Sequence, residues 1–192
     1  MEVADRIREP RETLSMNPKK FTLWLFLVSI IMIFASQTSA YLVRRAEGNW
    51  LEFEIPQIFI YSTIVLIASS ISMHWAYLCA KKDNSASLKI AISITFVLGT
   101  LFLAMQFLGW TDLVKENVYF VGNPSGSFFY VFTGLHGFHI ISGLFVLIYC
   151  LIGVFNSKIH SKRLNRIEIA STYWHFLDIL WIYLYVFLLI FH

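Results

Sequence analysis

Two pairs of polar residues stand inside long apolar stretches of this sequence and could do chemistry there. His136 and His139 lie three residues apart in TGLHGFHIISG, and His175 and Asp178 lie three apart in YWHFLDILW. Residues three apart share one face of a helix, so each pair presents both side chains on one side. Such side chains can hydrogen-bond between helices, relay protons or, for histidine, bind haem iron or another metal.

Three interpretations of these residues compete. We favour a structural polar cluster of His136, His139, His175 and Asp178 between two neighbouring helices, because polar side chains within a membrane usually pair inside the protein. The second interpretation is an Asp–His proton relay. The third is a haem held between His175 and one of the other two histidines. Six histidines and two distant cysteines in the whole chain offer few metal ligands.

The neighbours of these residues favour a close helix seam. Small residues let a second backbone approach, and three glycines share the stretch of the first histidine pair: Gly134, Gly137 and Gly143. Trp174, Asp178 and Trp181 follow one another at i, i+4 and i+7, which places an acid between two indoles whose N–H groups could donate to it without any metal. Glu168 stands at the start of the last apolar stretch, where a carboxylate favours a helix N-terminus.

Five apolar stretches must position these side chains, and each is long enough to cross a membrane as a helix. About 20 apolar residues suffice for a crossing, and the chain is 57% hydrophobic but only 14% charged. The predicted spans cover about 21–43, 56–80, 89–110, 128–154 and 168–190. The sequence therefore predicts an all-α, polytopic membrane protein with one five-helix domain at 21–192.

Charge predicts how the helices are oriented. Residues 1–20 are polar and lack the apolar core of a signal peptide, so we expect a retained N-terminal tail. With that tail inside, inside segments hold twelve of the 15 Lys and Arg residues and outside segments hold three. Because Lys and Arg are enriched in cytoplasmic loops, the N-terminus is predicted to be cytoplasmic and the C-terminus outside. The net charge of +3 then reflects topology, and no nucleic-acid partner is expected.

Two long motifs resemble subunit III of the haem–copper respiratory oxidases, the cytochrome c and quinol oxidases. GSFFYVFTGLHGFHIISG at 126–143 matches the family pattern FY-x-x-TG-x-HG-x-H-x-x-x-G. EIASTYWHFLDILWIYLYV at 168–186 matches E-x-x-x-x-YWHF-x-D-x-x-W. The resemblance extends more weakly over residues 21–190, and five helices are similar to the compact bacterial form of this subunit.

This resemblance implies a non-catalytic subunit of a proton-pumping terminal oxidase, which reduces oxygen to water in aerobic respiration. In that family subunit III packs on the catalytic subunit I, encloses phospholipid, and supports proton uptake and the stability of the complex. It binds no haem or copper, so the implied cofactors lie in partner subunits and no catalytic or metal-binding residue is expected here. The implied location is the bacterial inner membrane, with an upstream respiratory complex as a further candidate partner.

Two positions depart from the pattern of the longer family members. Those proteins often carry an acidic residue where this sequence has Ile30, and another where it has Gly109. Asp178 is therefore the only acidic residue deep within a predicted span. From the residues alone, two rival functions stay open: a membrane cytochrome with haem between the fourth and fifth spans, and a small proton-coupled transporter that uses Asp178.

Overall fold

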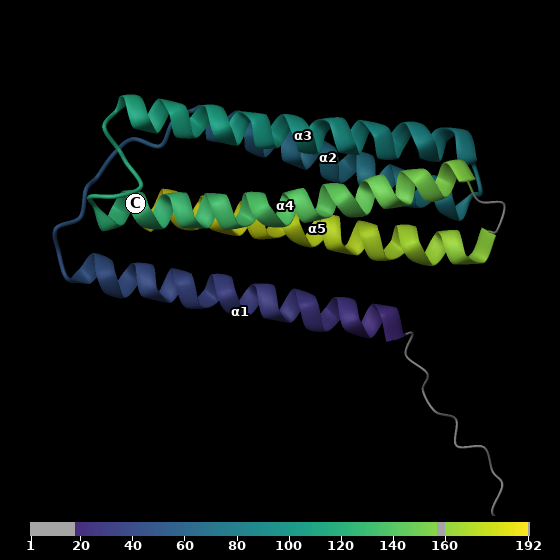
Figure 1. Cartoon of the computed structure of the whole chain (residues 1–192), viewed down its shortest axis with the longest axis horizontal. Coiled ribbons are helices and arrows are strands. Elements are labelled where there is room, and N and C mark those ends of the chain that lie inside the picture. Colours follow the sequence, from purple (N-terminus) through teal and green to yellow (C-terminus); the bar gives the residue numbers. More distant parts are fainter. Residues whose placement is uncertain (1–17, 157–159, 192) are drawn as a thin grey trace, which may run out of the picture.

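Five long helices make up the computed structural model, which describes residues 18–156 and 160–191, without the side chains of 156 and 160–163 (Figure 1). They are α1 Pro18–Ala46, α2 Ile58–Lys81, α3 Ser85–Lys115, α4 Pro124–Asn156 and α5 His160–Phe191. By length and composition, all five could cross a membrane. The prediction of an all-α bundle of five apolar helices is confirmed.

The helix ends lie outside most of the predicted boundaries. The largest difference is in α5, which begins at His160 rather than at 168. Each apolar stretch ends at the first polar residues, whereas the helical backbone continues through them. Residues 18–20 of the expected tail already belong to α1, and 1–17 lie outside the described residues.

The helices form two layers with α1 at one edge. In Figure 1, α3 and α4 lie in front of α2 and α5. Helix α1 runs below α4 and α5, on the side away from α3. Among the described residues, α1 contacts only α4 and α5, whereas α2 contacts both α3 and α5. Helices α4 and α5 each contact three others, and α5 contacts α1, α2 and α4.

Asparagine side chains begin two of these helices. Asn84 precedes α3 and accepts a hydrogen bond from the Ser87 backbone N–H at 3.2 Å. Asn123 precedes α4 and accepts from the Ser125 N–H at 2.9 Å. Each amide oxygen satisfies one of the N–H groups that a helix start leaves free. Pro124 fits the first position of α4 because it has no N–H to satisfy.

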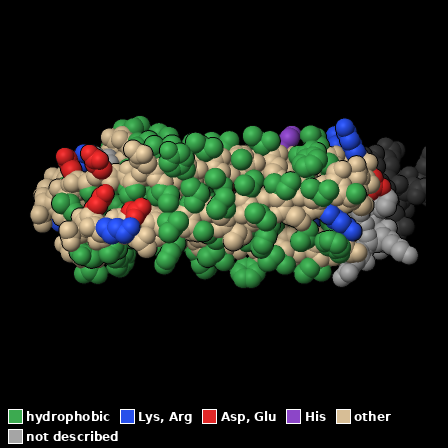
Figure 2. Space-filling model, turned by 90° about the horizontal axis from the view of Figure 1, so that it is seen from above, with side chains coloured by type: hydrophobic (Ala, Val, Ile, Leu, Met, Phe, Trp, Pro, Cys, Tyr) green, Lys and Arg blue, Asp and Glu red, His purple; other side chains and the backbone are tan. Residues whose placement is uncertain are grey.

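The surface separates charge from apolar side chains along the bundle. Figure 2 shows the charged side chains gathered at the two ends, with a continuous apolar band between them. Large apolar side chains point outward from every helix, among them Met32, Ile71, Val97, Phe145 and Ile190. An apolar outer surface on long helices is what a lipid environment favours.

Trp174 of α5 requires glycine on two neighbouring helices. A Cβ atom added to Gly99 of α3 would lie 2.7 Å from the Trp174 ring, and one added to Gly143 of α4 would lie 3.1 Å from it. The indole is 1% exposed, and its Nε1–H donates to the Ser69 hydroxyl of α2 at 3.1 Å. The ring therefore has little freedom to move away.

The substitution Gly99→Ala should destabilise the bundle by about 1–3 kcal/mol, because it overpacks a buried contact whose aromatic partner is held in place. Gly134→Ala is the matched control, since its Cβ would lie 3.8 Å from Trp110 in ordinary contact. Thermal unfolding in detergent, followed by tryptophan fluorescence, compares the two variants. Equal midpoints for both would show that the Gly99 contact does not limit packing.

Candidate functional site

His136 of α4 is buried among aromatic rings. Its ring centroid lies 5.0 Å from that of Trp181 in α5 and 5.8 Å from that of Phe102 in α3. The side chain is fully buried, and neither ring nitrogen has a hydrogen-bond partner among the described residues. His136 thus joins α3, α4 and α5 by ring packing.

His139 faces a different neighbour. Its Nδ1 atom shares a hydrogen bond of 2.8 Å with the carbonyl of Leu135 in its own helix. Its ring centroid lies 5.9 Å from that of Phe34 in α1. One turn further along α4, the hydroxyls of Ser142 and Tyr173 share a hydrogen bond of 2.6 Å. This part of α4 therefore contacts α1 and α5 together.

His175 and Asp178 lie on the side of α5 that faces α2. His175 Nδ1 and the Ser70 hydroxyl share a hydrogen bond of 2.7 Å, and the His74 ring centroid lies 6.0 Å from that of His175. Asp178 is 3% exposed and lies near the same Ser70 hydroxyl, but no described residue bonds to either carboxylate oxygen.

The expected single cluster between α4 and α5 is therefore not formed. His136 packs toward α3 and α5, His139 toward α1, and His175 toward α2. Chain order places α4 beside α5 through their short connection, but a helix within a bundle has other neighbours as well. The polar side chains of α5 contact α2, which is far from α5 in the sequence.

The two indole N–H groups do not donate to Asp178. Trp174 Nε1 donates to the Ser69 hydroxyl at 3.1 Å, and Trp181 Nε1 donates to the Thr63 hydroxyl at 2.9 Å. Spacing of i, i+4 and i+7 places residues on one helix face, but the long indole carries its N–H across to the next helix. Hydroxyls of α2 meet it there.

A row of hydroxyl side chains along α2 is the main feature that the sequence interpretation missed. The row consists of Ser62, Thr63, Ser69, Ser70 and Ser72. The row also forms hydrogen bonds to α3. Ser62 accepts one from the Gln106 amide at 3.0 Å, and Ser72 accepts one from the Thr95 hydroxyl at 3.1 Å. The pattern STIVLIASSIS carried the signal, since hydroxyls on a membrane helix commonly bond across helices.

The predicted packing glycines divide between two neighbours. Gly143 lies against Trp174 and Leu177 of α5, whereas Gly134 and Gly137 lie 3.8 Å, measured from an added Cβ, from side chains of α3. On the same face of α4, Thr133 accepts a hydrogen bond of 3.0 Å from Trp110 of α3. These small residues therefore serve the α3–α4 contact as well as the α4–α5 contact.

Glu168 bonds to a lysine rather than to a helix start. Lys20 of α1 donates to its carboxylate at 2.7 Å, and both side chains are more than a third exposed. Because α5 begins at His160, Glu168 lies about two turns inside the helix, beyond the reach of the free N–H groups of its first turn. The pair joins α1 to α5 near one end of the bundle.

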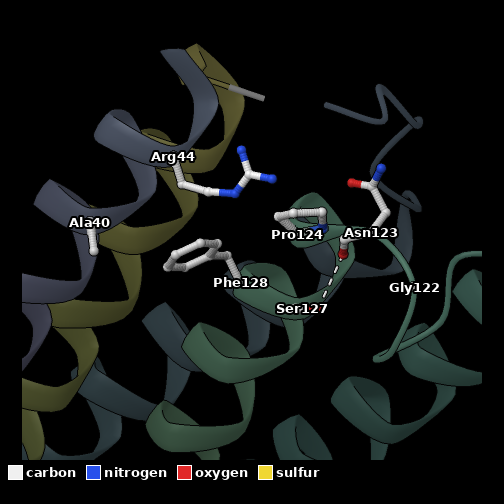
Figure 3. Close-up of a pocket in the computed structure, with 7 residues that line it drawn as sticks. All are labelled: Ala40, Arg44, Gly122, Asn123, Pro124, Ser127 and Phe128. Atoms are coloured by element: carbon white, nitrogen blue, oxygen red, sulfur yellow. Dashed lines mark hydrogen bonds between the residues drawn. The ribbon is translucent and has the colours of Figure 1, made fainter. Parts of the chain in front are cut away.

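No three His, Cys, Asp or Glu side chains lie close enough to hold a metal ion within 18–156 and 160–191. A hollow of about 550 Å³ opens at the other end of the bundle, between α1 and the start of α4 (Figure 3). Its lining residues are Ala40, Arg44, Gly122, Asn123, Pro124, Ser127 and Phe128. This set includes no carboxylate, histidine or thiol.

The residues of the two motifs form contacts between helices. Comparison with known proteins identifies the family in which these contacts occur. The family model for cytochrome c oxidase subunit III matches residues 11–192. The chain belongs to this family. It is 34% identical over 171 residues to a probable cytochrome c oxidase subunit 3 of Nocardia farcinica, covering 84% of this chain and 82% of that protein.

Other relatives show which form of the subunit this is. A probable cytochrome c oxidase subunit 3 of Mycobacterium bovis is 32% identical over 167 residues, which cover 84% of this chain and 82% of that one. The subunit 3 of Osphranter robustus is 36% identical over 136 residues, but these cover only 49% of its length. The chain therefore has the five-helix form of the actinobacterial relatives. It is a multi-pass membrane protein and a subunit of the respiratory cytochrome c oxidase complex, as its two motifs implied.

The bond between Trp174 and Ser69 should contribute a measurable coupling energy. We expect the double-mutant cycle of Trp174→Phe and Ser69→Ala to give a coupling of about 0.5–1.5 kcal/mol, the range of interhelical hydrogen bonds in membranes. Unfolding of each variant in mixed micelles measures it. The control cycle combines Ser69→Ala with Trp181→Phe, because Trp181 donates to Thr63 instead. Equal coupling in both cycles would contradict the assignment.

Proposed function

We propose that this chain is a non-catalytic subunit, which packs on the catalytic subunit I and stabilises the oxidase complex. Haem and copper then belong to partner subunits, and this chain supports proton uptake through the stability that it gives to its partners. One observation carries the proposal: the three histidines of the two motifs contact three different sets of helices instead of sharing one site.

The two rival functions fit the geometry less well. A haem between α4 and α5 needs histidines that face one another, whereas His136 is packed between the rings of Trp181 and Phe102 and His175 bonds to Ser70 of α2. A proton-coupled transporter usually places its site at discontinuous helices. Asp178 instead lies within α5, which is helical without a break from His160 to Phe191.

We further infer the orientation and the membrane. Lys81 and Lys89 lie at the same end of the bundle as Lys20, since α1, α2 and α3 alternate in direction. A cytoplasmic N-terminus satisfies the preference of Lys and Arg for the inner side. The likeness to actinobacterial relatives supports a bacterial inner membrane. Assembly with an upstream respiratory complex belongs to the same proposal.

A groove between α1 and α5 is the place that we assign to bound phospholipid. An apolar cavity of about 330 Å³ is lined by Ile31, Phe34, Ala35, Phe176, Ile179, Leu180 and Tyr183. Nearer the Lys20 end, a smaller cavity of about 180 Å³ is lined by Lys20, Leu23, Trp24, Glu168, Ile169 and Thr172. The first suits an acyl chain, and the lysine of the second suits a phosphate group.

Gentle detergent extraction of the native complex tests the proposed function. We expect haem–copper subunits to co-purify with this chain, and the chain separated from them to be colourless. Mass spectrometry of the co-purifying chains and an optical spectrum of each fraction measure this. A separated chain with its own Soret band would instead make His136, His139 and His175 candidate haem ligands.

Filling the groove should displace the lipid. We expect Ala35→Trp to lower the phospholipid retained per complex, because the indole would occupy space that an acyl chain uses. Lipid extraction of the purified complex and quantitative mass spectrometry measure the ratio. Ser36→Trp is the matched control, since Ser36 is exposed on the same helix but does not line the groove. The assignment fails when both variants retain as much lipid as the wild type.

A further inference from the structure

We propose that the outer face shared by α2 and α5 is a docking face for a transmembrane helix of another oxidase subunit. That helix would place a hydrogen-bonding side chain against His74. The inference rests on the proposed function, because it requires that the chain be assembled with other membrane subunits. It goes further by naming the face, the kind of partner and the residues that receive it.

His74 lies at a depth where an outward-facing imidazole needs a partner. It stands seven residues before Lys81 at the end of α2, or about 10 Å inside that end at 1.5 Å per residue. His175 lies at a similar depth below the polar pair of Glu168 and Lys20. A polar side chain in the hydrocarbon region is costly unless it is paired within protein, yet His74 is exposed.

The described chain does not provide that partner. The His74 ring lies 6.4 Å from the Tyr77 ring and 6.0 Å from the His175 ring, centroid to centroid. No hydrogen bond joins His74 to any of the described residues. Beside it, His175 uses Nδ1 for Ser70 and leaves Nε2 without a partner. The Asp178 carboxylate, buried next to Ser70, also has no bonded partner in the described part of the chain.

Several outward hydroxyl groups on other helices are satisfied locally. Each donates its hydroxyl to a carbonyl of its own helix at 2.7–2.9 Å: Ser29 to Phe26, Ser36 to Ile33, Ser93 to Lys89 and Thr100 to Phe96. His74 makes no such bond in its own helix, whereas the His139 imidazole bonds to the Leu135 carbonyl at 2.8 Å. His74 is thus an outward side chain without a hydrogen bond in the described residues, at the place where α2 meets α5.

The surface around His74 is a row of exposed side chains along α2. Exposed residues of α2 follow heptad-like spacing through the histidine: Ile60, Ile64, Ile67, Ile71, His74 and Leu78. Helix α3 has an equally spaced exposed row that includes Ile90, Ile94, Val97, Leu101 and Leu108. The two rows differ in chemistry, because the α3 row is apolar throughout. Lipid tails can cover the apolar side chains of the α3 row. The α2 row includes His74, which requires a polar group on its partner.

Photo-crosslinking in the assembled oxidase tests which face meets protein. A photoreactive phenylalanine analogue replaces Ile71, which is 67% exposed one turn from His74, or the control Val97 of α3, which is 62% exposed. We expect position 71 to form an adduct with another oxidase subunit and position 97 to label mainly lipid. Adducts of position 71 with lipid alone or with a second copy of this chain would overturn the proposal, as would equal subunit labelling from both positions.

Substitution of His74 tests the polar contact itself. His74→Leu suits a helix in lipid and leaves the fold intact, but it should reduce retention of this chain in the complex roughly threefold to tenfold as detergent rises. His74→Gln keeps hydrogen-bonding groups and should restore retention. Unchanged retention of the leucine variant would overturn the proposal. Failure of the wild-type chain to co-purify with haem–copper subunits would instead refute the proposed function.

Discussion

The packing of Trp174 is the interaction on which the rest of the bundle depends. This one side chain of α5 reaches three other helices: it donates to Ser69 of α2, lies against Gly99 of α3 and lies against Gly143 of α4. Two glycines are needed for the ring to fit, and one hydroxyl is needed for its N–H. Because lipid offers no hydrogen bonds, a buried indole must find its acceptor within the protein, and this fixes the position of α2 against α5.

Helix α1 is held by a different and weaker set of contacts, and their positions bear on the proposed lipid site. Its links to α5 lie mainly near the ends and outer edge: the Lys20–Glu168 pair, the contact of Thr38 with Tyr183, and the Tyr41 hydroxyl on the Phe191 carbonyl. Between the first of these and the others lies the apolar groove. The spacing of these links leaves room for an acyl chain between α1 and α5, at the proposed lipid site.

The sequence allowed the spans and the family to be predicted, but not the partners of the polar side chains. Hydropathy and two long motifs were enough for the first. The motif spacing could place Trp174, Asp178 and Trp181 on one face, but it could not show that α2 lies opposite that face. Contacts between α2 and α5 join residues more than a hundred positions apart, such as Ser70 with His175 and Thr63 with Trp181. A single sequence holds no record of such pairs.

The motif residues and His74 therefore have different structural roles. Trp174, His136 and Gly143 are buried and fix how the helices of this chain pack on one another. His74 lies outside both motifs and faces outward. Indole N–H groups and hydroxyls pair with one another in the interior, whereas the outer imidazole of His74 has no bond to its own helix. Under the proposed docking, the contacts that select a partner lie in outer residues such as His74, while the buried residues keep the helices in place.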